Sequence, residues 1–198
     1  ARVLYYKTLE PVIKKRIPVW IKNTFNPASK GTRISLRSNS RSNSSGGVKA
    51  ITSVAHANLV TLRGDQIFRF PGMAAKALEA LASQSITTLM VIQLSVDNVL
   101  SLAVRHEELD QVRTLLQKTF ELEVRHGYMG PIEVMRQAAI IVAIGENMEG
   151  TPGIAGRIFG ALGSNGINVI AIAQGSSEMS ISFAVRSGDA KKAVRALH

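Results

Sequence analysis

The stretch Leu59-Val-Thr-Leu-Arg-Gly64 returns 81 positions later as Ile140-Ile-Val-Ala-Ile-Gly145, and the match continues without a gap for more than forty residues. Identical residues recur along both copies: Gly64 and Gly145, Pro71-Gly72 and Pro152-Gly153, Ala80-Leu81 and Ala161-Leu162, Gln93 and Gln174, Ala103-Val-Arg105 and Ala184-Val-Arg186. A fixed period of this kind is typical of a duplicated structural unit. The chain therefore contains two copies of one module.

Each copy carries the same order of local signals. An apolar run at 57–63 or 138–144 predicts a strand, which leads through a glycine-containing loop to Pro-Gly and a helical pattern. Two β-rich runs separated by a polar turn then predict a hairpin. These runs span 88–93 with 99–104, and 168–174 with 180–185. A second helical pattern covers 107–120 or 189–197, and 121–126 is expected to be the last strand of the first copy. The predicted fold class is α+β: two ferredoxin-like βαββαβ modules, with antiparallel sheets and helices on one face.

The second copy reaches the end of the sequence before its last strand. The one strand-like segment without an assignment is 48–53, which precedes the first copy. We therefore predict that this segment completes the second sheet, so that module one is inserted into module two. Module 1 would then span 54–130, and module 2 would combine 48–53 with 131–198. A Ser/Asn/Arg/Gly-rich stretch at 37–47 is interpreted as a flexible linker.

Composition narrows the class of protein. The chain has 198 residues, 45% of them hydrophobic, and no cysteine. This is enough apolar material for one or two cores, and it leaves no disulfide framework. No run of about 18 apolar residues or signal peptide is seen, so no membrane partner is expected. The expected location is cytoplasmic, or a plastid if the source is a plant.

The net charge of +10 is concentrated near the N-terminus. Residues 1–49 hold 11 Lys and Arg and a single acidic residue, Glu10, whereas 50–198 hold 13 residues of each sign. A single-strand binder interleaves aromatic side chains with basic ones, and 26–55 contain no aromatic residue. No nucleic acid is expected as a partner.

Catalytic patterns are scarce. The four histidines are not at metal-ligand spacings, and no Gly-x-x-x-x-Gly-Lys-Ser/Thr phosphate loop is present. The acidic pairs Glu107-Glu108 and Glu121-x-Glu123 are interpreted as exposed charges on a helix and a strand edge. We therefore expect no catalytic residue, no metal and no cofactor in this chain.

Both copies contain the same candidate binding feature. A loop and helix start, 64–72 or 145–153, faces a strand that ends in Gln93 or Gln174. Free N–H groups at a helix start attract a carboxylate, and glycines allow its close approach. A glutamine amide both donates and accepts hydrogen bonds, and Asp97 or Glu178 could pair with an ammonium group. These are the needs of a zwitterionic amino acid, although Pro-Gly could equally be a plain helix start and the glutamines plain edge residues. The candidate effector-binding residues are Gly64, Asp65, Gly72, Met73, Gln93, Ser95, Asp97, Gly145, Gly153, Ile172, Gln174, Ser176 and Glu178.

Residues 151–185, TPGIAGRIFGALGSNGINVIAIAQGSSEMSISFAV, closely resemble the ACT domains of aspartate kinases, especially those fused to homoserine dehydrogenase. Residues 1–36 resemble the C-terminal end of the same family's kinase domain, through 7–11 (KTLEP), 17–19 (IPV) and 22–27 (KNTFNP). The resemblance implies the closing strand, helix and strand of that domain, without its catalytic machinery.

The resemblance also implies a function. Aspartate kinase phosphorylates the β-carboxylate of aspartate with ATP and Mg²⁺ in lysine, threonine and methionine biosynthesis, and end products inhibit it through tandem ACT domains. In threonine-sensitive relatives a glutamine in each module belongs to the effector site, and these positions match Gln93 and Gln174. The resemblance therefore favours threonine, then lysine, as effector, and a homodimer or higher homo-oligomer with a possible fused homoserine dehydrogenase. The bulky first loop and Ser95-Val-Asp-Asn98 depart from the family pattern.

Two other interpretations stay open at this stage. The modules could serve chiefly as a dimerisation platform, because ferredoxin-like sheets can pair edge to edge across a two-fold axis. Alternatively, the basic N-terminal residues could bind DNA in an amino-acid-responsive transcription regulator. Against this last possibility, no helix-turn-helix pattern precedes the repeat, and Pro11, Pro18 and Pro27 interrupt the segment.

Overall fold

The computed structural model describes residues 6–34, 47–65, 72–146, 148, 150–175 and 179–198. The chain divides into two compact units, Ala1–Ser44 and Ser45–His198. The first unit contains the helix α1 (Tyr6–Lys14) and an antiparallel pair of short strands, β1 (Val19–Ile21) and β2 (Thr32–Ile34). The strand expected before this helix would fall within 1–5, outside the described residues.

The second unit is built on one six-stranded antiparallel sheet with the order β4-β5-β3-β6-β8-β7. Its strands are β3 (Gly47–Arg63), β4 (Met90–Leu94), β5 (Val99–Arg105), β6 (Glu133–Glu146), β7 (Ala171–Gln174) and β8 (Ser180–Arg186). The helices of the repeat are α2 (Met73–Ser83), α3 (Leu109–Thr119), α5 (Ile154–Ser164) and α6 (Ala190–Leu197). The predicted α+β class with two ferredoxin-like modules is confirmed.

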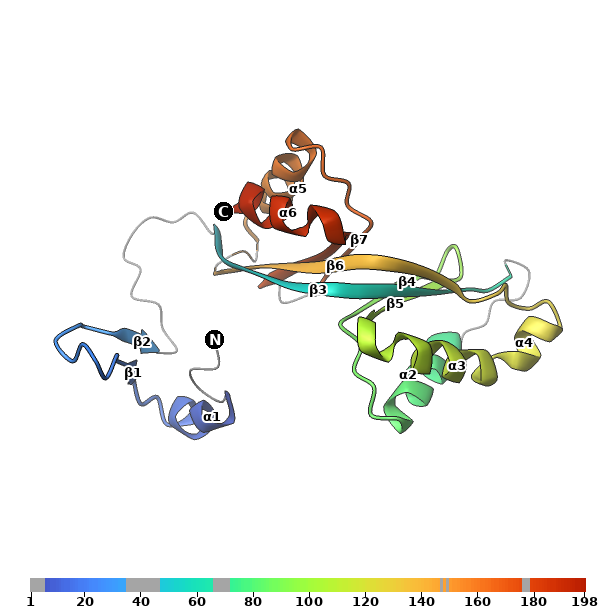
Figure 1. Cartoon of the computed structure of the whole chain (residues 1–198), viewed down its shortest axis with the longest axis horizontal. Coiled ribbons are helices and arrows are strands. Elements are labelled where there is room, and N and C mark those ends of the chain that lie inside the picture. Colours follow the sequence, from blue (N-terminus) through green and yellow to red (C-terminus); the bar gives the residue numbers. More distant parts are fainter. Residues whose placement is uncertain (1–5, 35–46, 66–71, 147, 149, 176–178) are drawn as a thin grey trace. The chain divides into compact units, whose positions relative to one another are not determined.

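The two central strands β3 and β6 are long because each serves both modules (Figure 1). The first half of β3 pairs with the module 2 part of β6, from Val48 opposite Gly145 to Val54 opposite Ile140. Its second half pairs with β5, from Ala57 opposite Arg105 to Arg63 opposite Val99. The segment 48–53 thus lies beside the first strand of module 2, and module one is inserted into module two as predicted. The domain boundaries themselves remain a prediction, and β3 already begins at Gly47.

A bulge marks the place where each long strand passes between the modules. The β3 and β6 pairing shifts register between Val54 and Ala57. His56 in this interval has a φ of 63°, and Gln137, its equivalent 81 positions later, has a φ of 61°. A bulge bends its strand and increases the local twist. The duplicated bulge therefore lets one strand contribute to two differently oriented halves of the sheet.

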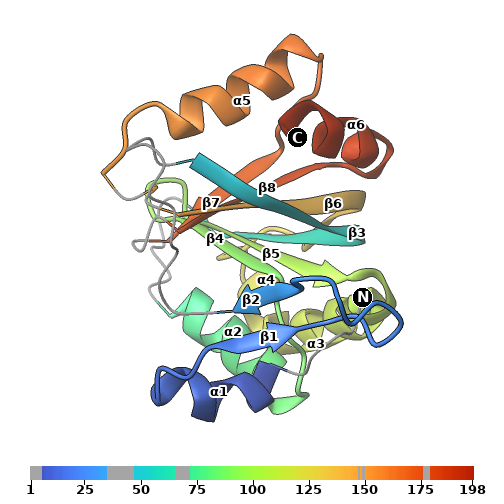
Figure 2. The same cartoon turned by 90° about the vertical axis from the view of Figure 1, so that its left-hand side faces the viewer.

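Helices cover the two outer faces of the bent sheet, with α2 and α3 on one side and α5 and α6 on the other (Figure 2). Beneath α2 and α3, one buried cluster includes Leu62, Leu102 and Phe120. Beneath α5 and α6, a second includes Ile141 and Phe183. A third cluster lies on the opposite face of the sheet, where small residues such as Ala57, Ala103, Ala138 and Ala184 allow the two halves to approach closely. The modules therefore form a layered pair.

The end of module 1 differs from the prediction. Residues 121–126 were expected to form its last strand, but Glu121–Arg125 form a short helix, α4. The last strand of module 1 is instead the first part of β6, where Glu133, Val134 and Met135 lie opposite Thr61, Val60 and Leu59. The helix is stabilised by an ion pair one turn apart, between Arg125 and Glu121.

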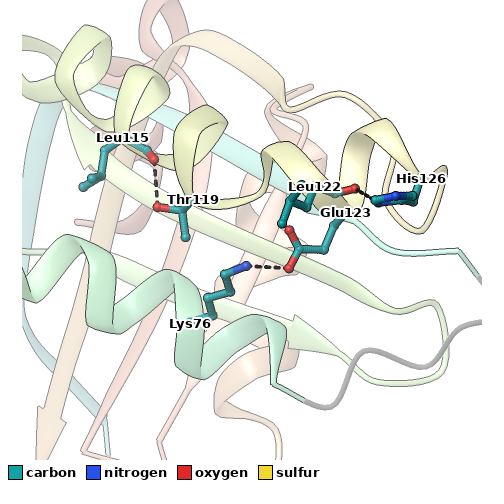
Figure 3. A network of polar contacts seen from close by, with 6 residues as sticks. All are labelled: Lys76, Leu115, Thr119, Leu122, Glu123 and His126. Carbon is teal, nitrogen blue, oxygen red and sulfur yellow. Dashed lines mark hydrogen bonds and ion pairs between the residues drawn. The ribbon is translucent and has the colours of Figure 1, made fainter.

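A partly buried ion pair between Lys76 of α2 and Glu123 of α4 connects the two helices (Figure 3). The Glu123 side chain is only 13% exposed, so its interpretation as a surface charge was wrong. Lys76 also lies over the ring of Phe120, 5.1 Å from its centroid. Burial raises the pKa of the Glu123 carboxyl. The hydrogen bonds from Lys76 and from the Glu123 backbone, with the charges of Lys76 and His126, outweigh that effect and hold the pKa below its usual value.

Replacing Glu123 with glutamine is expected to reduce the free energy of unfolding by about 1 kcal/mol near neutral pH, because a charged and partly buried pair is lost. Since folding lowers the pKa of this group, its contribution is complete above the unfolded pKa, about 4.5, and is lost as the pH falls through the folded value. Urea denaturation at pH 7 and at pH 3 measures this, with Glu121→Gln on the exposed face as control. A difference between wild type and Glu123→Gln that grows on acidification would contradict the assignment.

Candidate functional site

The two predicted glutamines lie at the ends of the two edge strands. Gln93 is the last residue but one of β4 and lies opposite Leu100 of β5, and Gln174 is the last residue of β7 and lies opposite Ile181 of β8. Leu100 and Ile181 belong to the cores beneath the helices. Directly opposed residues share a face of the sheet, so both glutamines lie on the helix-covered face, at its open margin. Both are exposed and accessible to a ligand.

The hairpin turn of module 1 lies against the end of β3. The N–H of Gly64 donates to the carbonyl of Asn98 over 2.8 Å, and the Asn98 side-chain amide donates to the carbonyl of Asp65 over 3.2 Å. A Cβ on Gly64 would lie 2.1 Å from Nδ2 of Asn98, so any larger residue at position 64 would displace the Asn98 side chain. The structure thus brings Gly64 and Asp65 next to the turn that holds the exposed Ser95 and Asp97.

Module 2 repeats this arrangement. The N–H of Gly145 donates to the carbonyl of Met179 over 3.0 Å, and Met179 is the equivalent of Asn98. A Cβ on Gly145 would lie 2.6 Å from the carbonyl oxygen of Gly47. Ser176 and Glu178, predicted to form the polar turn here, lie outside the described residues. Ile172 lies two residues before Gln174 and is 47% exposed on the same margin.

The predicted helix starts follow these loops. Gly72 is the N-cap of α2, and Gly153, at a φ of 85°, is the N-cap of α5. Both are exposed. The first N–H groups of a helix have no acceptor within the helix, so both starts can receive a carboxylate. Met73 is placed differently, since it is 3% exposed and packs in the module 1 core.

Sequence reasoning missed two contributors to module 1. Asn98 connects Gly64 with Asp65, and Tyr128 accepts a hydrogen bond from the N–H of Asp65 through its carbonyl, over 2.9 Å. Asn98 has a φ of 51°, a conformation that asparagine adopts more readily than most residues. Its place at the end of a polar turn was therefore the available signal. No such signal pointed to Tyr128, because its role depends on the unpredicted α4.

Two properties of the described residues bear on metal binding and membrane insertion. Within that part of the chain, no group of three His, Cys, Asp or Glu side chains is placed to hold a metal ion. Among the same residues, no helix has the length and apolar character needed to cross a membrane.

Comparison with known proteins identifies the architecture. The family model of the ACT domain matches residues 141–198. Over all 198 residues the chain is 34% identical to the bifunctional aspartokinase/homoserine dehydrogenase of Haemophilus influenzae, of which it spans 24%. The chain therefore covers about a quarter of the length of this relative.

Solved structures agree with this match. The aspartate kinase of Clostridium acetobutylicum superposes with a TM-score of 0.83 and 27% identity, covering all of this chain and 44% of that one. The regulatory subunit of aspartate kinase from Thermus thermophilus shares the fold at a TM-score of 0.63 and 24% identity, over 77% of this chain and 97% of that subunit. Over its whole length the chain therefore resembles aspartokinases, and its repeat corresponds to their ACT-containing regulatory region.

Proposed function

We propose that this chain is the feedback-inhibition region of an aspartokinase and that an end-product amino acid binds to it. Threonine is the first choice of effector and lysine the second. The observation that carries the proposal is the repetition of one arrangement in both modules. In each, a glycine at a strand end contacts the hairpin turn, an exposed helix start follows, and an edge strand carries an exposed glutamine near its end.

The chemistry of this arrangement suits a zwitterion. The helix starts at Gly72 and Gly153 offer N–H donors and a positive dipole end to the α-carboxylate. The amides of Gln93 and Gln174 offer both a donor and an acceptor, which suits a hydroxyl or an ammonium group. Asp97 supplies a negative charge for the ammonium group in module 1, and Glu178 is proposed for the same role in module 2.

Inhibition requires that the effector prefers one arrangement of the enzyme. An amino acid shifts an equilibrium between active and inactive forms only by its difference in affinity for them. We propose that the parent enzyme phosphorylates L-aspartate with ATP and Mg²⁺, which bind outside this chain. A fused homoserine dehydrogenase, the second activity in the name of the Haemophilus relative, is part of the proposal. The proposed location is the cytoplasm, or a plastid in a plant.

Dimerisation is a second role that a specific observation favours. The edge strands β4 and β7 carry exposed apolar side chains at Val91, Leu94 and Ile172. Unpaired strand edges with such residues are suited to pairing across a two-fold axis. We therefore include a homodimer or higher homo-oligomer in the proposal. The transcription-regulator alternative finds less support, because α1, with Pro11 inside it, is the one helix among residues 6–34.

Substituting Gln93 or Gln174 with alanine in the full-length enzyme is expected to weaken feedback inhibition by about 10-fold, since one or two effector hydrogen bonds would be lost. The measurement is the threonine concentration that halves the kinase rate. The matched control is Gln117→Ala. It removes an exposed glutamine from α3, a helix that contributes no residue to the proposed effector site. Unchanged inhibition in both site variants would favour a dimerisation platform without sensing.

A further inference from the structure

An apolar groove of about 170 Å³ lies on module 2, between α5, the end of α6 and the start of β3. It is lined by Val48, Ala143, Ile154, Arg157, Ile158, Ala161, Ala196 and Leu197. Among the described residues of this lining, only Arg157 is charged. The groove does not include Gln93 or Gln174, nor any other residue of the edge strands β4 and β7.

The internal repeat gives every lining residue an equivalent in module 1. Seven follow from the shift of 81 positions: Leu62, Met73, Lys76, Ala77, Ala80, Leu115 and Leu116. The eighth follows from strand pairing, because Val48 lies opposite Gly145 and Met129 lies opposite the equivalent Gly64. Arg157 therefore corresponds to Lys76, so the cation is present in both modules.

In module 1 the corresponding space is filled. Phe120, the residue directly after α3, is fully buried in the cluster with Met73, Leu116 and Met129. Lys76 lies over its ring, and Glu123 three residues later pairs with Lys76 (Figure 3). In module 1 an aromatic ring thus fills this space, and a carboxylate pairs with the cation beside it.

We propose that the module 2 groove seats an aromatic side chain located three residues beyond His198 in the parent protein, followed after three more residues by a carboxylate that faces Arg157. This rests on the proposal that the chain is part of a longer aspartokinase. The size is suitable, since an apolar cavity of about 150 Å³ accepts a benzene ring. The charge also matches, because Arg157 stands where Lys76 binds Glu123.

This contact would connect the proposed effector site of module 2, at the start of α5, with the segment that follows α6. The helix α5 begins at Ile154, next to Gly153, and its residues Ile154, Arg157 and Ile158 line the groove. An effector that displaces the start of α5 would therefore also change the shape of the groove in which this segment binds. The groove thus offers a route from module 2 to a following domain.

Cysteine labelling tests whether the groove is covered. The chain has no cysteine, so Ala161→Cys places a single thiol in the groove. In the protein of residues 1–198 this thiol is expected to react rapidly with a maleimide, and in the full-length parent at least about 10-fold more slowly, with labelling at position 161 measured by peptide mass spectrometry. Equal rates in both proteins would overturn the proposal.

A second experiment tests the aromatic ring itself. The module 1 sequence Lys118–Arg125, which runs from the last turn of α3 to the end of α4, is added after His198. A matched protein carries alanine in place of the phenylalanine in this segment. The phenylalanine version is expected to melt roughly 5 °C or more above the alanine version and to protect the thiol. Equal melting temperatures would overturn the proposal, even if the full-length protein shields the groove, because another partner would then cover it. Neither experiment involves an amino-acid effector, so failure of the proposed sensing function would leave both results unchanged.

Discussion

A protein that starts at Ala57 is expected to lose the cooperative unfolding of module 2, whereas one that starts at Ser45 is expected to retain it. The two differ only in the first half of β3, which lies along β6 from Gly47 to Val54. Its loss would expose one side of β6 and remove Val48 and Ile51 from the module 2 core. The missing interactions are comparable with the whole stability of a small domain, about 5–15 kcal/mol.

The comparison is made by thermal denaturation together with amide exchange of β6 and β8. The protein starting at Ser45 is the control, because Ser45–His198 form one compact unit. We expect slow exchange in β8 for this protein and fast exchange for the shorter one. Equal protection in both would contradict the insertion of module one into module two.

Truncating Phe183 to alanine is expected to lower the free energy of unfolding by about 3–5 kcal/mol, as for other fully buried phenylalanines. Phe183 lies on β8 with no exposed surface, beneath α5 and α6. Its ring meets that of Phe159 edge to face, with centroids 5.8 Å apart. The substitution removes both the buried area and this ring contact.

The same substitution at Phe25 provides the control, because that side chain is 98% exposed. Its effect is expected to stay within about 0.5 kcal/mol. Chemical denaturation followed by circular dichroism measures both changes. A loss below about 1 kcal/mol for Phe183→Ala would show that the module 2 core is packed differently from the structure described above.

Much of the fold could be predicted from the sequence because the repeat tests each assignment twice. Strand 57–63 and strand 138–144 share their apolar pattern, and the lack of a last strand in the second copy pointed to 48–53. The error at 121–126 has a physical cause. Glu-Leu-Glu-Val-Arg alternates polar and apolar residues like a strand, but the pairing of Glu123 with Lys76 of α2 favours a helix. Such a contact across 47 positions cannot be seen in local sequence.

The candidate site was predictable in outline only. The repeat and the strand pattern placed Gln93 and Gln174 at the ends of hairpin strands. The structure shows in addition that these strands, β4 and β7, are the two edges of the sheet. The contact of Asn98 with Gly64 could not be predicted, since it depends on how the hairpin turn meets the end of β3. For Met73 two predictions were in conflict, because the helical pattern places it in the core and the site prediction requires it to be accessible. Its burial agrees with the helical pattern.

The central claim is that this region binds an end-product amino acid, and titration calorimetry of the protein with L-threonine tests it most directly. The account predicts a saturable heat of binding that Gln174→Ala weakens and that D-threonine does not reproduce. L-lysine is titrated in parallel as the second candidate effector. If neither L-threonine nor L-lysine gives a heat above dilution with a folded protein, the claim is contradicted.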